Sequence, residues 1–141
     1  MQALMETEFE YFSGLVSRYS DAVLVPGYEY ADARAANCHD NAEVFVKAHP
    51  DHSVVRGWLL AGIAFTSGMY RIVAHSVVRR PGALGLIDVT PLSASDRQCY
   101  RFLEHRGTEQ EFLALKAKFP ELYFPPPVLE EPFFMGEQTR T

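Results

Sequence analysis

Residues 54–79 read VVRGWLLAGIAFTSGMYRIVAHSVVR, and this stretch decides the fold. It holds two segments rich in valine and isoleucine, 54–65 and 70–79, on either side of the turn-forming pair Ser67-Gly68. β-Branched residues on both sides of such a turn are typical of an antiparallel hairpin. The sequence therefore predicts two long antiparallel strands joined at this turn.

Two shorter segments extend this hairpin. The apolar stretch 84–89 follows the turn pair Pro81-Gly82 and predicts a third strand, and residues 99–104 predict a fourth. Strands that follow one another through short turns usually pair with their neighbours in sequence. We therefore expect a contiguous antiparallel meander.

Helices are expected on both sides of these strands. A capping box at Thr7–Glu10 begins a predicted helix over 8–19. A second capping box at Thr108–Glu111 begins a predicted helix that ends at about residue 118. Asn37 is a favourable cap for a helix over 38–48, whose apolar positions recur on one face. The predicted fold class is α+β, with N-terminal helices packed on an antiparallel sheet and a C-terminal helix.

The composition indicates one globular domain over residues 1–141, with a core at about 35–105 and a Pro-rich tail at about 120–141. Aromatic residues at 123, 124, 133 and 134 predict that part of this tail packs on the body or on a partner. A net charge of −5 without a run of basic residues disfavours nucleic-acid binding. No apolar stretch is long enough for a membrane span. We expect a cytoplasmic protein with two free thiols, Cys38 and Cys99.

Three residues of this framework can carry acyl-transfer chemistry together. Cys38 begins a helix, where unpaired backbone N–H groups lower a thiol pKa. A loop of two or four residues across Pro81-Gly82 would pair His75 directly with Asp88 on one face of the sheet, whereas a loop of three or five residues would not. We expect that face to be covered by the Cys38 helix, with the imidazole between sulfur and carboxylate. The expected contacts are about 3–4 Å from thiol to imidazole and about 2.7–3.2 Å from imidazole to carboxylate.

The order of these motifs resembles the transglutaminase-like branch of the papain-like cysteine-peptidase fold. The resemblance covers about residues 35–92, and its motifs are Asn37-Cys38, the strand 55–59, His75-Ser76-Val77-Val78 and Ile87-Asp88-Val89-Thr90-Pro91. It implies a thioester intermediate, with Cys38 as nucleophile, His75 as general base and then acid, and Asp88 as the orienting group. It implies peptide, amide or acyl-group substrates and no cofactor, and it leaves hydrolysis and transfer both open.

The sequence departs from that family at the oxyanion donor. Papain-like enzymes place a Gln a few residues before the Cys, whereas residues 30–37 contain none. Asn37, Asn41 or backbone N–H groups would then serve as donors. His39 follows Cys38 directly and is expected at the surface, with the alternative that it lines the cleft.

Two other classes of function compete with the enzyme. A metal site could draw on several residues of suitable type, although no known ligand motif groups them. These residues are Cys38, His39, His49, His52, His75, Asp88, Cys99 and His105. A non-catalytic binding or regulatory domain is the second alternative, and the missing Gln and the aromatic tail favour it.

Overall fold

The computed structural model describes residues 3–35, 37–63 and 68–126, and its architecture is α+β. The predicted hairpin of β1 (Ser53–Gly62) and β2 (Tyr70–Arg79) forms, and it runs through the centre of the molecule. β2 has the predicted bounds. β1 ends at Gly62, and the predicted continuation through 64–65 and the turn residue Ser67 lie outside the described residues.

The strand order is β3-β2-β1-β4, and a fifth strand also pairs with β2. β3 (Leu86–Ile87) pairs with the end of β2, while β5 (Glu121–Phe124) pairs with its beginning. β4 (Arg101–Glu104) pairs with β1 on the other edge. The predicted meander is therefore wrong beyond β3. The chain after β3 forms a parallel bridge between Asp88 and Gly27, so the segment around Gly27 occupies the position next to β3.

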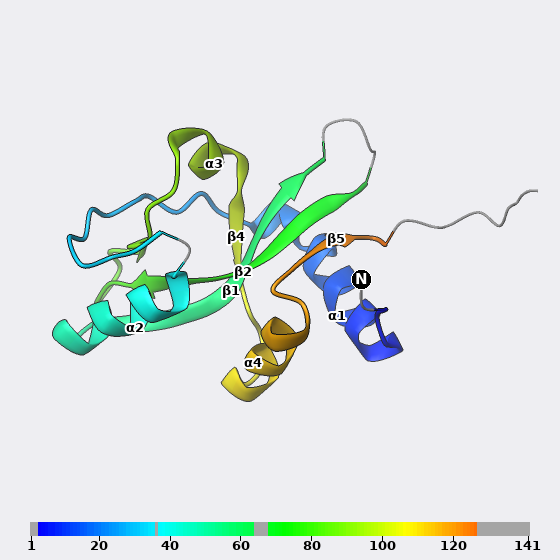
Figure 1. Cartoon of the computed structure of the whole chain (residues 1–141), viewed down its shortest axis with the longest axis horizontal. Coiled ribbons are helices and arrows are strands. Elements are labelled where there is room, and N and C mark those ends of the chain that lie inside the picture. Colours follow the sequence, from blue (N-terminus) through cyan, green and yellow to red (C-terminus); the bar gives the residue numbers. More distant parts are fainter. Residues whose placement is uncertain (1–2, 36, 64–67, 127–141) are drawn as a thin grey trace, which may run out of the picture.

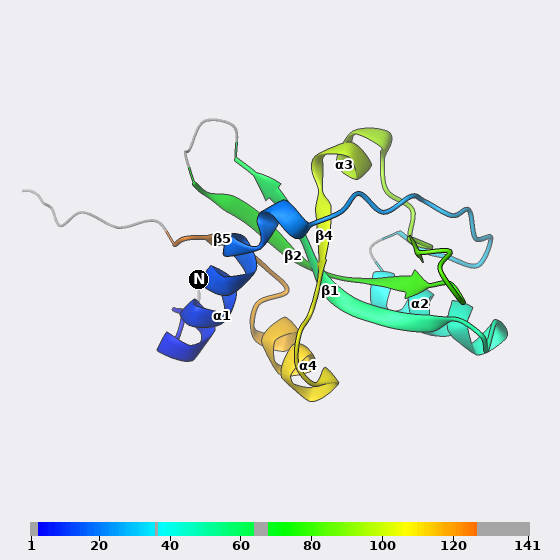
Figure 2. The same ribbon diagram turned by 180° about the vertical axis from the view of Figure 1, so that it is seen from behind.

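In the described part of the chain, four α-helices accompany the sheet (Figures 1 and 2). α2 (Cys38–Ala48) and α4 (Glu109–Lys118) begin and end as predicted, and Thr108 and Glu111 form the predicted capping box. α1 (Glu6–Ser17) begins earlier than predicted, because Glu8 rather than Glu10 accepts a backbone hydrogen bond, from Met5 N at 2.8 Å. Both views place α1 and α2 at opposite ends of the hairpin.

α3 (Ala94–Cys99) was not predicted. The Ser93 side chain caps it by accepting a hydrogen bond from Asp96 N at 3.1 Å. Cys99 therefore ends a helix, whereas the sequence placed it at the start of the fourth strand. Cys99 is exposed, and both cysteines are free thiols.

The two faces of the hairpin are covered differently. We call the face of Val54, Trp58, Ile72 and Val78 the helix face, because α1, α2 and α4 bury their apolar residues against it. The opposite face, with Val55, Leu59, His75 and Val77, we call the loop face. Its apolar residues pack with Val25, Leu92, Tyr100 and Phe102. The loop face is therefore covered mainly by irregular segments and by β4 residues.

The beginning of the tail packs on the body, as expected. Phe124 in β5 is buried, and its ring centroid lies 6.2 Å from that of Phe12 in α1. Residues 133 and 134 lie outside the described residues. No helix in the described part of the chain is both long and apolar enough to cross a membrane.

Candidate active site

Cys38 is the first residue of α2, and its side chain is buried against β2. Its sulfur lies 4.0 Å from the Ala74 carbonyl oxygen. Asn37 occupies the cap position, but its side chain makes no capping hydrogen bond. The first-turn N–H groups beside the sulfur therefore donate no hydrogen bond to that side chain. They have no partner within the helix either, which leaves them available to an anion.

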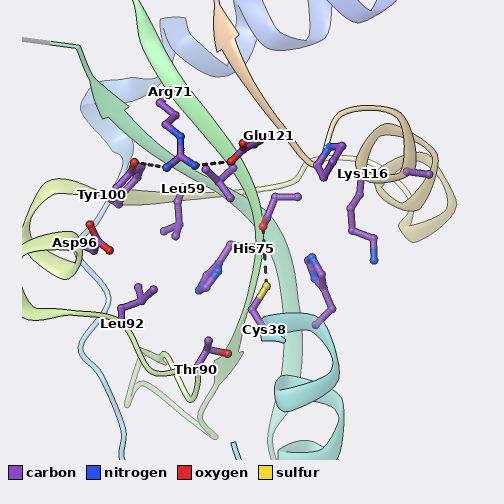
Figure 3. Close-up of a pocket in the computed structure, with 15 residues that line it drawn as sticks. Cys38, Leu59, Arg71, His75, Thr90, Leu92, Asp96, Tyr100, Lys116 and Glu121 are labelled. Atoms are coloured by element: carbon purple, nitrogen blue, oxygen red, sulfur yellow. Dashed lines mark hydrogen bonds and ion pairs between the residues drawn. The ribbon is translucent and has the colours of Figure 1, made fainter. Parts of the chain in front are cut away.

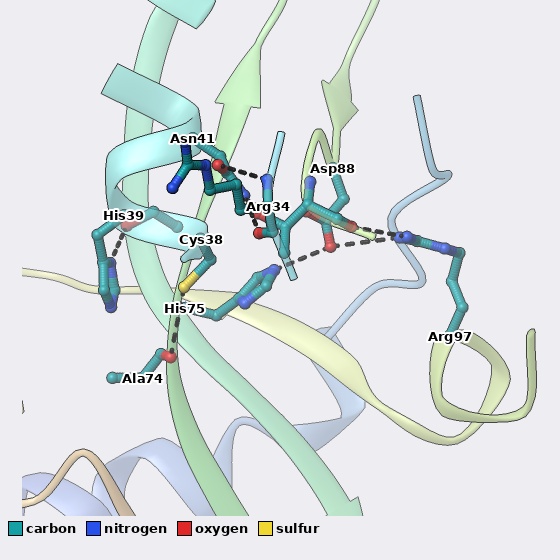
Figure 4. A network of polar contacts seen from close by, with 10 residues as sticks. Arg34, Cys38, His39, Asn41, Ala74, His75, Asp88 and Arg97 are labelled. Atoms are coloured by element: carbon teal, nitrogen blue, oxygen red, sulfur yellow. Dashed lines mark hydrogen bonds and ion pairs between the residues drawn. The ribbon is translucent and has the colours of Figure 1, made fainter. Parts of the chain in front are cut away.

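The sulfur reaches its partners through a gap in the strand pairing of β2. On one edge of β2, β5 pairs with Tyr70–Val73 and β3 pairs with Val78 and Arg79. Within the described residues, no strand pairs with 74–77 on this edge. Ala74 N donates instead to the Pro120 carbonyl at 3.0 Å. The N-terminus of α2 lies at this gap, so Cys38 can approach from the helix face and still contact His75 on the loop face (Figure 4).

The predicted contact between His75 and Asp88 is confirmed. Nε2 of His75 lies 2.8 Å from Oδ2 of Asp88, and both side chains are almost completely buried. Figure 4 shows the imidazole between the Cys38 sulfur and the Asp88 carboxylate, as expected.

The predicted register and face are wrong, although the contact forms. β2 and β3 pair Val78 with Ile87, so a continued ladder would place Asp88 opposite Val77 rather than opposite His75. Asp88 is then diagonal to His75, which keeps both on one face and within side-chain reach. That face is the loop face, whereas α2 packs on the helix face through Ala42 and Phe45. The turn comprises residues 81–84, because Arg80 N donates to the Gly85 carbonyl, and its centre lies one residue later than that of a turn centred on Pro81-Gly82.

Asp88 has two further partners that orient its carboxylate. Thr90 N donates to Oδ1 at 3.1 Å, and Nη1 of Arg97 donates to Oδ2 at 3.2 Å. Nη2 of Arg97 also donates to the Thr90 carbonyl at 3.1 Å. Arg97 lies against Gly27, where an added Cβ would be 2.9 Å from the guanidinium carbon. Sequence reasoning missed Arg97, because nothing local marks an Arg of a short, unpredicted helix as the partner of a distant carboxylate.

Asn41 is a buried positioning residue. Its Nδ2 donates to the Arg34 carbonyl at 2.7 Å and to Oγ1 of Thr90 at 2.9 Å, while its Oδ1 accepts from Arg34 N at 3.1 Å. Both amide hydrogens are thus engaged, which leaves none for an oxyanion. Asn41 instead ties α2 to the loop that carries Asp88. Asn37 is exposed at the cap position.

His39 lines the cleft, and the expectation that it points to the surface is wrong. Nδ1 of His39 lies 2.6 Å from Oγ of Ser76, a fully buried residue on the helix face. The same hydroxyl accepts from Nη1 of Arg56 at 3.0 Å. Figure 4 shows the Cys38 sulfur between the rings of His39 and His75.

Two imidazoles and one carboxylate change the acidities at this site. Burial raises the pKa of Cys38, but hydrogen bonds with His39 and His75 outweigh it and lower the pKa to about 6. Burial lowers the pKa of His75, and hydrogen bonds with Asp88 and Cys38 raise it to about 9. Between these two values a thiolate–imidazolium pair is the favoured state.

A pocket of about 700 Å³ opens at Cys38 and His75. This volume is typical of small-molecule sites. Figure 3 shows Leu59, Leu92 and Tyr100 on the His75 side and Lys116 on the other side. The far end is closed where Arg71 donates to the Tyr100 hydroxyl and pairs with Glu121. The pocket can therefore hold a group with an apolar part next to the sulfur.

Comparison with protein-family models, with curated proteins and with solved structures finds no match. Among the described residues, no three His, Cys, Asp or Glu side chains come together as a set of metal ligands.

Proposed function

We propose that this chain is a thiol-dependent hydrolase or acyltransferase for peptide, amide or other acyl-group substrates. The observation that carries the proposal is the buried hydrogen bond between His75 and Asp88, with the opposite side of the imidazole turned to the Cys38 sulfur. A nucleophile, a base and a group that orients the base form the arrangement that activates a thiol.

In this mechanism the Cys38 thiolate attacks the substrate carbonyl carbon and forms a carbon–sulfur bond. The carbonyl electron pair moves to oxygen, where the first-turn N–H groups of α2 would receive the negative charge. When the intermediate collapses, the leaving group takes a proton from the His75 imidazolium. The resulting thioester then passes its acyl group to water or to another acceptor, and His75 removes the acceptor's proton.

The order of elements supports a distant relation to the transglutaminase-like branch of the papain-like fold. Cys38 begins α2, His75 lies in β2, and Asp88 comes directly after β3, the next strand along the chain. A reducing, cytoplasmic setting would keep both thiols free.

A non-catalytic binding domain is the second candidate, because Cys38 is only 9% exposed. Two measurements on the same protein separate the candidates. Iodoacetamide labelling, read at each cysteine by mass spectrometry, should give Cys38 an apparent pKa of about 6 and a higher rate at neutral pH than at Cys99. Equal rates, or an apparent pKa near the free value of about 8.5, would favour the binding domain.

The second measurement is turnover. We expect the chain to be acylated by p-nitrophenyl acetate and to release p-nitrophenol in a burst, and Cys38→Ala should abolish the burst. Cys99→Ser is the matched control and should retain it. Substrate class is then read from a panel of acetyl to octanoyl thioesters and peptide p-nitroanilides. Labelling of Cys38 without any acylation would contradict the enzyme proposal.

A further inference from the structure

We propose that His39 is a second catalytic imidazole, which donates a hydrogen bond to the oxyanion that forms on the substrate. This inference rests on the proposed function. It adds a side-chain donor to the first-turn N–H groups of α2, in the role that the missing Gln and the engaged Asn41 do not fill. It concerns a residue on the opposite side of the sulfur from His75 (Figure 4).

A series of hydrogen bonds connects Arg56, Ser76 and His39. Arg56 can only donate, so its contact with Oγ of Ser76 at 3.0 Å uses a lone pair of that oxygen. The hydroxyl hydrogen of Ser76 is then available to Nδ1 of His39, 2.6 Å away. In the tautomer that accepts at Nδ1, the hydrogen is on Nε2. The hydrogen bonds from Arg56 to Ser76 and from Ser76 to His39 therefore prepare His39 as a donor toward the pocket.

The residues of this hydrogen-bond series are held rigidly. Ser76 is fully buried in β2, and the Arg56 side chain is only 10% exposed. Arg56 also pairs with Glu43 of α2 and, at 3.3 Å, with Glu109 of α4. An oxyanion donor acts through its fixed position, so that no reorganisation is needed when charge develops. Arg56 fixes Ser76, and Ser76 fixes the ring of His39.

His39 also shares the pocket with the reacting groups. The ring lines the same pocket as Cys38 and His75, and its hydrogen bond with the thiol helps to lower the pKa of Cys38. When the thiolate attacks, its charge passes to the carbonyl oxygen of the bound substrate. A donor that first stabilises the thiolate is then adjacent to the new anion, which accepts its hydrogen while the carbon–sulfur bond forms.

The test compares two reactions of the Cys38 thiolate. Alkylation by iodoacetamide displaces iodide and forms no oxyanion, whereas acylation by p-nitrophenyl acetate forms one. The ratio of acylation rate to alkylation rate at one pH cancels the effect of thiolate fraction. Removing an oxyanion donor typically costs about 10²–10³ in rate, so His39→Ala should lower this ratio by about that factor.

Three further variants sharpen the result. His39→Gln keeps an N–H donor of similar reach and should recover part of the ratio. Ser76→Ala keeps the imidazole but removes its Nδ1 partner, and should lower the ratio less than His39→Ala does. His52→Ala, a histidine that does not line the pocket, should leave it unchanged.

The outcomes separate this inference from the proposed function. If acylation depends on Cys38 but His39→Ala leaves the ratio within about threefold of wild type, His39 is not the donor. Equal losses in alkylation and acylation would also overturn the inference, because they would show that His39 acts only on the thiolate. If Cys38→Ala is acylated as fast as wild type, the proposed function itself fails.

Discussion

Replacing Asp88 by Asn removes the negative charge next to His75 while nearly preserving side-chain volume. The Asn amide would also present N–H groups to His75 and Arg97, so both hydrogen bonds to Oδ2 are affected. Burial, which lowers the pKa of His75, remains, whereas the hydrogen bond that raises it to about 9 is lost. The pKa of His75 should therefore fall toward its ordinary value of 6.5.

The size of the effect follows from these two values. At about pH 8 the imidazolium fraction would fall from about nine-tenths to about one-thirtieth, a roughly 30-fold loss, while at about pH 6 it would change little. The assay is the pH dependence of acylation by p-nitrophenyl acetate between about pH 5 and 10. Wild type should give a bell with limbs near 6 and 9. In Asp88→Asn the basic limb should move from near 9 toward 6.5.

Glu104→Gln is a matched control, because it neutralises an exposed carboxylate that pairs with Arg79 on the sheet surface. It should leave both limbs in place. A basic limb that stays near 9 in Asp88→Asn, in a protein whose thermal unfolding remains cooperative, would refute the assigned role of Asp88.

Two further substitutions test the supports of the site. Gly57→Ala would place a Cβ 2.3 Å from the Leu103 carbonyl oxygen and 2.6 Å from the Phe102 ring. We expect it to lower the free energy of unfolding by about 1–3 kcal/mol in urea titration, and an unchanged midpoint would contradict this packing. Arg97→Met removes a charged donor from the buried Asp88 carboxylate and should lower the free energy of unfolding by about 1–3 kcal/mol. The same loss of stability is expected in about 1 M salt, because the Arg97–Asp88 pair is mostly buried and therefore weakly screened. A loss of stability that disappears in salt would argue against this contact.

The sequence alone places the three chemical groups on suitable elements. Asn37 and the apolar positions that follow it mark the start of a helix, and Cys38 begins that helix. The β-branched residues around His75 mark its strand, whose bounds were predicted correctly. These features are legible because helix capping, helical periodicity and β-propensity depend on neighbouring residues.

What lies in contact across the chain was less predictable. The turn after β2 shifts the pairing so that Asp88 meets His75 diagonally, and a shift of two residues keeps the face. The hydrogen bond could therefore be predicted while its register could not. Arg97 escaped prediction because its helix has only six residues and its partner lies on another segment.

The sequence by itself determined that a helix-start thiol, a strand imidazole and a following carboxylate occur in one small α+β domain. Only the tertiary structure decided how they meet. β3 and β5 share one edge of β2, and no other strand of the described residues pairs with 74–77 there. The Cys38 sulfur on one side of the sheet therefore reaches the His75 imidazole on the other. It also turned His39 inward, toward Ser76 and the sulfur. The physical reason is that strand pairing is non-local. The edge that stays open depends on where two segments distant in sequence find hydrogen-bond partners, and no local pattern records that choice.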